Sequence, residues 1–112
     1  MEFKRSAIWE ALKIKITKTA LAMANLRDGG VIIVGVEEDD STWKLTGVAA
    51  SDLATYDEDA VNDHINKFST PTMRVELVRI AHNSMEFLAI NVPEFERSPV
   101  ICGRDGQDMR RG

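Results

Sequence analysis

Cysteine, proline and long hydrophobic runs are all scarce in this sequence. Its one cysteine, Cys102, cannot form a disulfide within the chain. Three prolines and seven glycines in 112 residues leave no stretch with the composition of a linker. The longest apolar run is far shorter than the roughly 20 residues of a membrane-spanning helix, and no leader-peptide pattern is present. We therefore expect one cytoplasmic domain, with its cysteine in the reduced state and without a membrane segment.

Aromatic residues are also few, at 6% of the chain. Phe3, Phe68 and Phe87 lie within apolar patterns that favour burial in a core. Few aromatic side chains are then left to stack on nucleic-acid bases. If this protein binds nucleic acid, the sequence favours contacts to the backbone over the reading of base sequence.

Several cofactor and catalytic motifs are missing. The glycines precede the main apolar run instead of following it, and no Gly-Lys-Ser/Thr occurs, which excludes a dinucleotide fingerprint and a P-loop. His64 and His82 share no ligand spacing with each other or with Cys102, so a zinc site is not expected. No nucleophile with a partner base is recognisable. We expect no required cofactor.

Charge is distributed unevenly along the chain, although the net charge is −4. Residues 1–27 carry six basic and two acidic side chains, whereas residues 28–66 carry one basic and ten acidic side chains. Such segregation can place a basic face on an acidic protein. It is equally compatible with ordinary solvated helix surfaces, and both interpretations stay open.

Hydrophobic periodicity predicts the first half of the fold. Apolar residues at three- and four-residue steps predict an amphipathic helix from residue 8 to about residue 26, which Gly29 and Gly30 end. The continuous apolar run of residues 31–36 predicts a central strand that is covered on both faces. A polar turn with four carboxylates follows, and residues 44–48 predict the return strand of a hairpin.

The second half is predicted by the same reasoning. Acidic residues at its start predict a helix over residues 57–69, with Val61, Ile65 and Phe68 on its buried face. Residues 73–81 and 86–92 predict a hairpin around "HNSM", and residues 99–102 predict a last short strand. The expected fold is an α/β (α+β) single domain, with a mixed central sheet of about five strands and two packed helices.

Two groups of basic residues are candidates for contacts to nucleic acid. One group lies on and before the first helix, and the other lies at the end of the chain. They are Lys4, Arg5, Lys13, Lys15 and Lys18, and Arg104, Arg110 and Arg111. If the last strand lies near the first helix, the two groups line one groove and neutralise several phosphates.

Several short motifs occur in the order seen in a known family. They are "EFKRS" at residues 2–6, "AMAN" at 22–25, the double glycine, "IIVGVEED" at 32–39, "LTGV" at 45–48 and "SPVICGRDGQDMRRG" at 98–112. The sequence resembles the Schlafen-type AlbA_2 domain over nearly its whole length. The resemblance implies a nucleic-acid-binding module. We expect residues 1–112 to be one such domain, the N-terminal part of a longer bacterial protein that is similar to transcriptional regulators.

For the RNA-cleaving Schlafen members, the resemblance implies a metal site of three carboxylates. Glu2 matches the acid of the Glu-Phe-Lys motif, and Glu38 matches the second acid after Gly-Val. The third acid precedes this motif in the family and has no match in this sequence. Glu2 and Glu38 are the candidate catalytic and metal-binding residues for Mg²⁺ or Mn²⁺. Alternatively, Glu2 and Lys4 form a surface pair, and residues 37–40 are a charged hairpin turn.

The sequence therefore favours a nucleic-acid-binding module, for DNA or RNA, over two alternatives. One alternative is a protein interaction or dimerisation domain, in which an edge strand such as residues 99–102 pairs with a second copy or with a downstream domain. The other is an Mg²⁺- or Mn²⁺-dependent endoribonuclease of the Schlafen type. In the favoured interpretation, basic side chains contact phosphates, while the acids of residues 37–40 face away or hold a metal.

Overall fold

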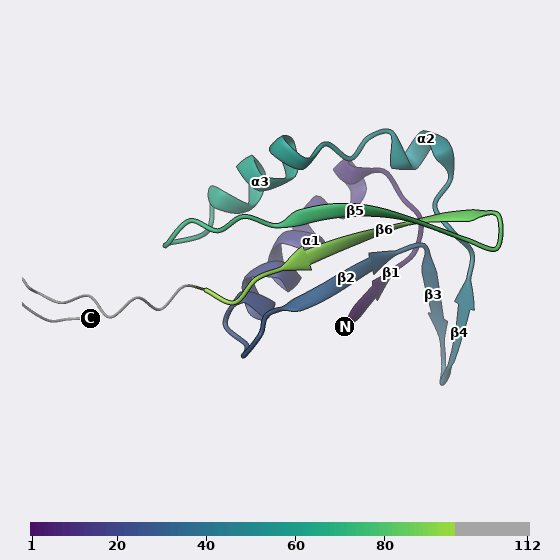
Figure 1. The fold of residues 1–112 in the computed structure, drawn as a ribbon, viewed down its shortest axis with the longest axis horizontal. Coiled ribbons are helices and arrows are strands. Elements are labelled where there is room, and N and C mark those ends of the chain that lie inside the picture. Colours follow the sequence, from purple (N-terminus) through teal and green to yellow (C-terminus); the bar gives the residue numbers. More distant parts are fainter. Residues whose placement is uncertain (96–112) are drawn as a thin grey trace, which may run out of the picture.

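The computed structural model describes residues 1–95, which form six strands and three helices (Figure 1). In chain order they are β1 (Glu2–Lys4), α1 (Trp9–Ala24), β2 (Gly30–Val34), β3 (Val36–Asp39), β4 (Thr42–Leu45), α2 (Ala50–Leu53), α3 (Glu58–Asn66), β5 (Glu76–His82) and β6 (Met85–Val92). The predicted α/β fold with a mixed sheet is confirmed. The predicted strand at residues 99–102 lies outside the described residues.

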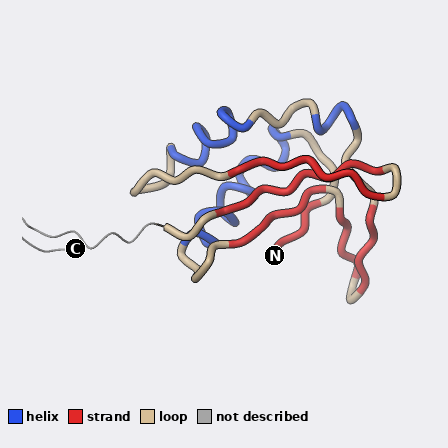
Figure 2. The backbone as a smooth tube through the Cα atoms, viewed as in Figure 1, coloured by secondary structure: helices blue, strands red, loops and turns tan. Residues whose placement is uncertain are grey.

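The main sheet has four strands in the order β1-β2-β6-β5. β1 runs parallel to β2, and the other two pairs are antiparallel. The prediction that residues 31–36 contribute an inner strand is confirmed by the position of β2. The sequence pattern does not predict β1, because three residues with a single apolar side chain give no strand signature. Figure 2 shows the ribbon of β3 and β4 leaving one end of this sheet.

The core lies between the helices and one face of the main sheet (Figure 1). Ile16 of α1, Ile32 of β2 and Ile90 of β6 have no exposed surface. The expectation that β2 is covered by other elements on both faces is wrong, because Val31 and Ile33 are only half-buried and point away from the helices. Their apolar character is explained by neighbouring strands, whose side chains flank them on the open face.

The hairpin of β3 and β4 forms where a return strand is predicted, but its turn is shorter than expected. Glu37, Glu38 and Asp39 belong to β3, and only Asp40 and Ser41 connect the two strands. Gly35, with φ +116°, separates β2 from β3 and lets the chain bend out of the main sheet. Alternation along β3 then directs neighbouring carboxylates to opposite faces of the ribbon.

α3 begins one residue after the predicted start and ends earlier than predicted. The side chain of Asp57 caps the helix by accepting a hydrogen bond from the backbone nitrogen of Ala60 at 2.9 Å. Val61 and Ile65 are fully buried, as expected. The prediction for Phe68 is wrong: this residue is 63% exposed, because the helix ends at Asn66 and no longer directs the side chain toward the core.

β5 and β6 form the predicted hairpin with a tighter turn than the four residues expected. Only Asn83 and Ser84 connect the strands, and both have positive φ, at 51° and 63°. Such a two-residue turn matches the twist of the paired strands. Within residues 1–95, no helix has both the length and the hydropathy that a membrane crossing requires.

Candidate functional site

β1 places two charged side chains on the helix side of the sheet. Glu2 is paired in register with Ile32, and Lys4 is paired with Val34. Because Ile32 and Val34 face the helices, Glu2 and Lys4 project to that side, while Phe3 projects to the open face. Lys4 Nζ lies 3.5 Å from Glu2 Oε2, so the surface pair that the sequence left open as an alternative is present.

The link from β1 to α1 is fixed by the α2 region. The Ser6 hydroxyl donates to Asp52 Oδ2 at 2.8 Å, and the Tyr56 hydroxyl donates to the carbonyl oxygen of Ala7 at 2.9 Å. Burial, with a smaller effect from the charge of Asp52, raises the pKa of Tyr56 to about 12. These bonds join segments more than 40 residues apart in sequence and hold β1 at a set position beside α1.

A cleft of 380 Å³ opens between β1, α1 and the base of the β3–β4 hairpin. We call it the β1–α1 cleft. The residues of its lining that matter here are Phe3, Lys4, Arg5, Lys15, Glu37 and Glu38. Among residues 1–95, neither Arg5 nor Lys15 has a carboxylate oxygen within 4.0 Å of its charged group. Two of the three cleft cations are therefore available to an anionic ligand.

The basic residues predicted on and before the first helix do not all lie in one cleft. Lys4, Arg5 and Lys15 meet in the β1–α1 cleft, and Lys18 lies in an adjacent cleft of 450 Å³ together with Glu2. Lys13 instead forms an ion pair with Glu10, 2.6 Å between Nζ and Oε2. The predicted contacts at Arg104, Arg110 and Arg111 lie outside the described residues.

Glu2 and Glu38, the predicted catalytic and metal-binding pair, line different clefts. Glu2 is paired with Lys4, and Glu38 Oε2 accepts a hydrogen bond from Trp43 Nε1 at 3.1 Å. Within residues 1–95, no three His, Cys, Asp or Glu side chains gather as metal ligands. Since the two carboxylates have other partners, this arrangement does not fit the implied metal, and the metal site stays a prediction.

Trp43 is the side chain at this site that sequence reasoning missed. Trp43 is 67% exposed, and the centroid of its ring lies 5.2 Å from that of Phe3 in an edge-to-face arrangement. The sequence gives a weak signal for this position, because a lone tryptophan in a polar hairpin has no apolar neighbours that would bury it. Trp43 therefore contacts two residues that line the β1–α1 cleft, Phe3 and Glu38, and leaves an exposed aromatic surface beside them.

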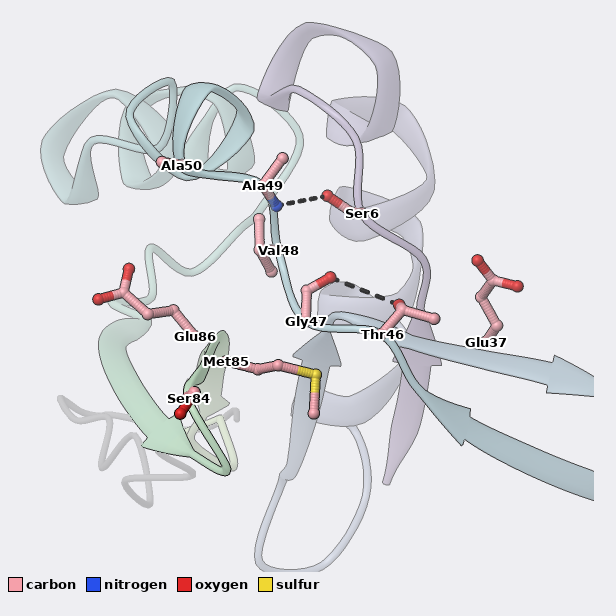
Figure 3. A pocket seen from close by; sticks show the side chains of 10 residues that line it. All are labelled: Ser6, Glu37, Thr46, Gly47, Val48, Ala49, Ala50, Ser84, Met85 and Glu86. Carbon is pink, nitrogen blue, oxygen red and sulfur yellow. Dashed lines mark hydrogen bonds between the residues drawn. The ribbon is translucent and has the colours of Figure 1, made fainter.

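A larger cleft, 680 Å³, lies on another side of the hairpin base (Figure 3). Figure 3 shows Glu37 and Glu86 at its rim and Ser6 accepting a hydrogen bond from the backbone nitrogen of Ala49. None of the ten residues that line it is basic. Its charge disfavours an anionic ligand, so the β1–α1 cleft is the better candidate for contacts to phosphate.

Comparison with protein families decides the classification. The family model for Schlafen, AlbA_2 matches residues 1–111. The chain belongs to this family. The resemblance of the sequence motifs to this family is thus confirmed, and the β1–α1 cleft is a feature of a Schlafen AlbA_2 domain. No curated protein matches the chain.

Two solved structures are similar to this AlbA_2 domain in fold. The DIP2311 protein from Corynebacterium diphtheriae has a TM-score of 0.60 at 22% identity; the match covers 88% of this chain and 21% of that one. The N-terminal domain of a RecG-related protein from Nitrosomonas europaea, named as a candidate ATP-dependent DNA helicase, has a TM-score of 0.55 at 22% identity; the match covers 85% and 63%. At these identities the likeness concerns the fold alone.

Proposed function

We propose that this AlbA_2 domain binds nucleic acid, DNA or RNA, mainly through phosphate contacts in the β1–α1 cleft. The observation that carries the proposal is the meeting of Lys4, Arg5 and Lys15 in one cleft of a protein with a net charge of −4. Family membership supports it, as does the name of one structural neighbour, which refers to a DNA helicase. In the longer bacterial protein that we expect, the domain would act as an N-terminal nucleic-acid-binding module.

The cleft offers cations of two kinds. Arg5 and Lys15 are exposed and have no carboxylate partner among the described residues, so they can neutralise phosphates directly. Lys4 is 16% exposed and already paired with Glu2, so it contributes mainly to the local potential. Binding that depends on a few such contacts weakens steeply as salt is added.

Two acids restrict how a strand can lie in the cleft. Glu37 and Glu38 both belong to its lining, and Glu37 also lines the 680 Å³ cleft. Their charge repels phosphates at the hairpin side and favours a path in which the backbone follows β1 and α1. This path requires no divalent cation.

The test is fluorescence anisotropy of a labelled 12-nucleotide strand and of a duplex, titrated with protein at several salt concentrations. The double change Arg5→Gln and Lys15→Gln should weaken binding to both and reduce the slope of log K against log salt by about 0.9 per lost phosphate contact on duplex, and by about 0.7 on single strands. Arg79→Gln is the matched control, because Arg79 lies on β5, at the opposite edge of the sheet. Equal effects of the double change and the control, or no binding by the wild type, would contradict the proposal.

A second candidate function is association through a sheet edge. β5 is an outer strand of the main sheet in the described part of the chain, and Val78 and Ile80 on it are 38% and 40% exposed. An open edge of this kind can pair with a second copy. Concentration-dependent dimerisation in sedimentation equilibrium, lost in Ile80→Lys and accompanied by no affinity for either polymer, would favour this candidate.

A further inference from the structure

The exposed ring of Trp43 is held in a defined orientation by two contacts. Its Nε1 donates a hydrogen bond to Glu38 Oε2 at 3.1 Å, and its edge meets the ring of Phe3 at a centroid distance of 5.2 Å. A tryptophan that is 67% exposed gains little from the hydrophobic effect, so burial does not explain its place on β4. Both contacts leave most of the ring surface open to a ligand.

The two residues that contact Trp43 also line the β1–α1 cleft. Phe3 and Glu38 belong to the lining of the β1–α1 cleft, together with Lys4, Arg5 and Lys15. Trp43 does not line this cleft itself, but it contacts two residues that do, which places its exposed ring beside the cations. An exposed aromatic ring near several cations is a combination that proteins use to bind unpaired nucleotides, with bases stacked on the ring and phosphates on the cations.

We propose that Trp43 is a stacking platform for an unpaired nucleobase, and that Glu38 acts as a positioning residue that orients its indole. This inference rests on the proposed function and narrows its ligand to nucleic acid with unpaired bases, such as single strands, loops or bulges. In a duplex the base faces are already stacked on one another, so the platform contributes nothing to duplex binding. The inference gives Glu38 a structural reason for its place in the cleft that does not involve a metal ion.

The test compares a fluorescein-labelled 12-nucleotide oligothymidine with a 12-base-pair duplex by anisotropy at one low salt concentration. Trp43→Ala should weaken binding to the single strand by about tenfold, since stacking contributes roughly 1–3 kcal/mol per base, and should leave duplex binding within about twofold. Phe68→Ala is the matched control, because Phe68 is 63% exposed but lies beyond the end of α3. It should change neither affinity.

The role of Glu38 is tested by two substitutions with opposite expectations. Glu38→Gln keeps a side-chain oxygen that accepts the indole hydrogen bond, so single-strand affinity should be preserved or increased. Glu38→Ala removes the acceptor, so single-strand affinity should fall. If Glu38 served as a metal ligand instead, binding would require a divalent cation and would fall in both variants, because the amide loses the charge that the metal needs. That pattern would overturn the positioning role.

Tryptophan emission gives an independent readout of stacking. The chain has two tryptophans, and Trp9 is 9% exposed, so quenching by oligothymidine should come from Trp43. Trp43→Phe should abolish the quenching while keeping part of the affinity. Circular dichroism of each variant checks that it is folded.

The outcomes separate the two proposals. If both polymers bind and Trp43→Ala changes neither affinity or both equally, the stacking platform is wrong while the proposed function stands. If neither polymer binds to the wild type, the proposed function and the platform both fail. If Trp43→Ala abolishes a concentration-dependent dimer and leaves single-strand affinity intact, the ring contacts a second copy, and the platform is again overturned.

Discussion

A β-carbon placed on Gly29 would overlap the carbonyl oxygen of Val92. Gly29 also has φ +66°, a conformation that other residues rarely adopt. The first glycine of the pair therefore makes the turn from α1 into β2 possible and lets the end of β6 pass close beside it. Gly29→Ala should lower the free energy of unfolding by roughly 1–3 kcal/mol or more, because both the backbone strain and the overlap oppose folding.

Gly30 provides the matched control. A β-carbon there would meet the end of the Met23 side chain, 2.6 Å from its sulfur, and a methionine side chain can move. Gly30→Ala should therefore cost clearly less than Gly29→Ala when both are measured by urea unfolding. Equal losses in the two variants would show that the double glycine is needed for another reason.

The single tyrosine of the chain provides a direct test of the link between α2 and the β1–α1 connection. Burial raises the pKa of Tyr56 to about 12, above the ordinary value of 10.0. Absorbance of the phenolate should therefore appear near pH 12 in the folded protein and near pH 10 in urea. Since the folded pKa is raised, this group stabilises the fold below pH 10, and the contribution is lost as the pH rises toward 12. A folded-state midpoint near pH 10 would contradict the burial of this hydroxyl.

His64 should make stability depend on pH near neutrality. Partial burial lowers its pKa below the ordinary value of 6.5, the charges of Lys13 and Lys67 act in the same direction, and Glu10 opposes them. Because the folded pKa is lowered, the unfolded chain takes up the proton first. The contribution of His64 to the free energy of unfolding is fully present above pH 6.5 and is lost as the pH falls through the pKa of the folded state.

Urea midpoints at pH 7.5 and pH 5.5 test this dependence. The decrease toward pH 5.5 should be smaller in His64→Gln than in the wild type. His82→Gln is the control, because His82 is exposed at the end of β5 and should leave the decrease unchanged. A wild-type midpoint that rises toward pH 5.5 would show that the sign is wrong.

Elements with a strong periodic pattern are those that the sequence predicts well. α1 and α3 repeat buried residues at helical spacing, and β2 is a continuous apolar run, so each is recognisable without a partner. β1 has only three residues, and it forms a strand because it pairs in parallel with β2. Phe68 continues the periodicity of α3 after the helix has ended, and a pattern cannot reveal that end.

The candidate site is predicted only in part for the same reason. Lys4, Arg5 and Lys15 can be proposed from local charge, but their meeting requires the pairing of β1 with β2 beside α1. Trp43 belongs to the site because the hairpin bends at Gly35, which brings its ring to Phe3. Such contacts depend on tertiary geometry, which no local pattern contains.

The measurement that most directly tests nucleic-acid binding at the β1–α1 cleft is amide chemical-shift mapping. Uniformly ¹⁵N-labelled protein would be titrated at low salt with the 12-nucleotide oligothymidine. The largest chemical-shift changes should fall on the amides of residues 3–5, 12–18 and 36–38 and on the indole N–H of Trp43. The amide signals of residues 76–82 in β5 should not shift. Shifts confined to β5 or to the rim of the 680 Å³ cleft, or no shifts at saturating oligonucleotide, would contradict the account.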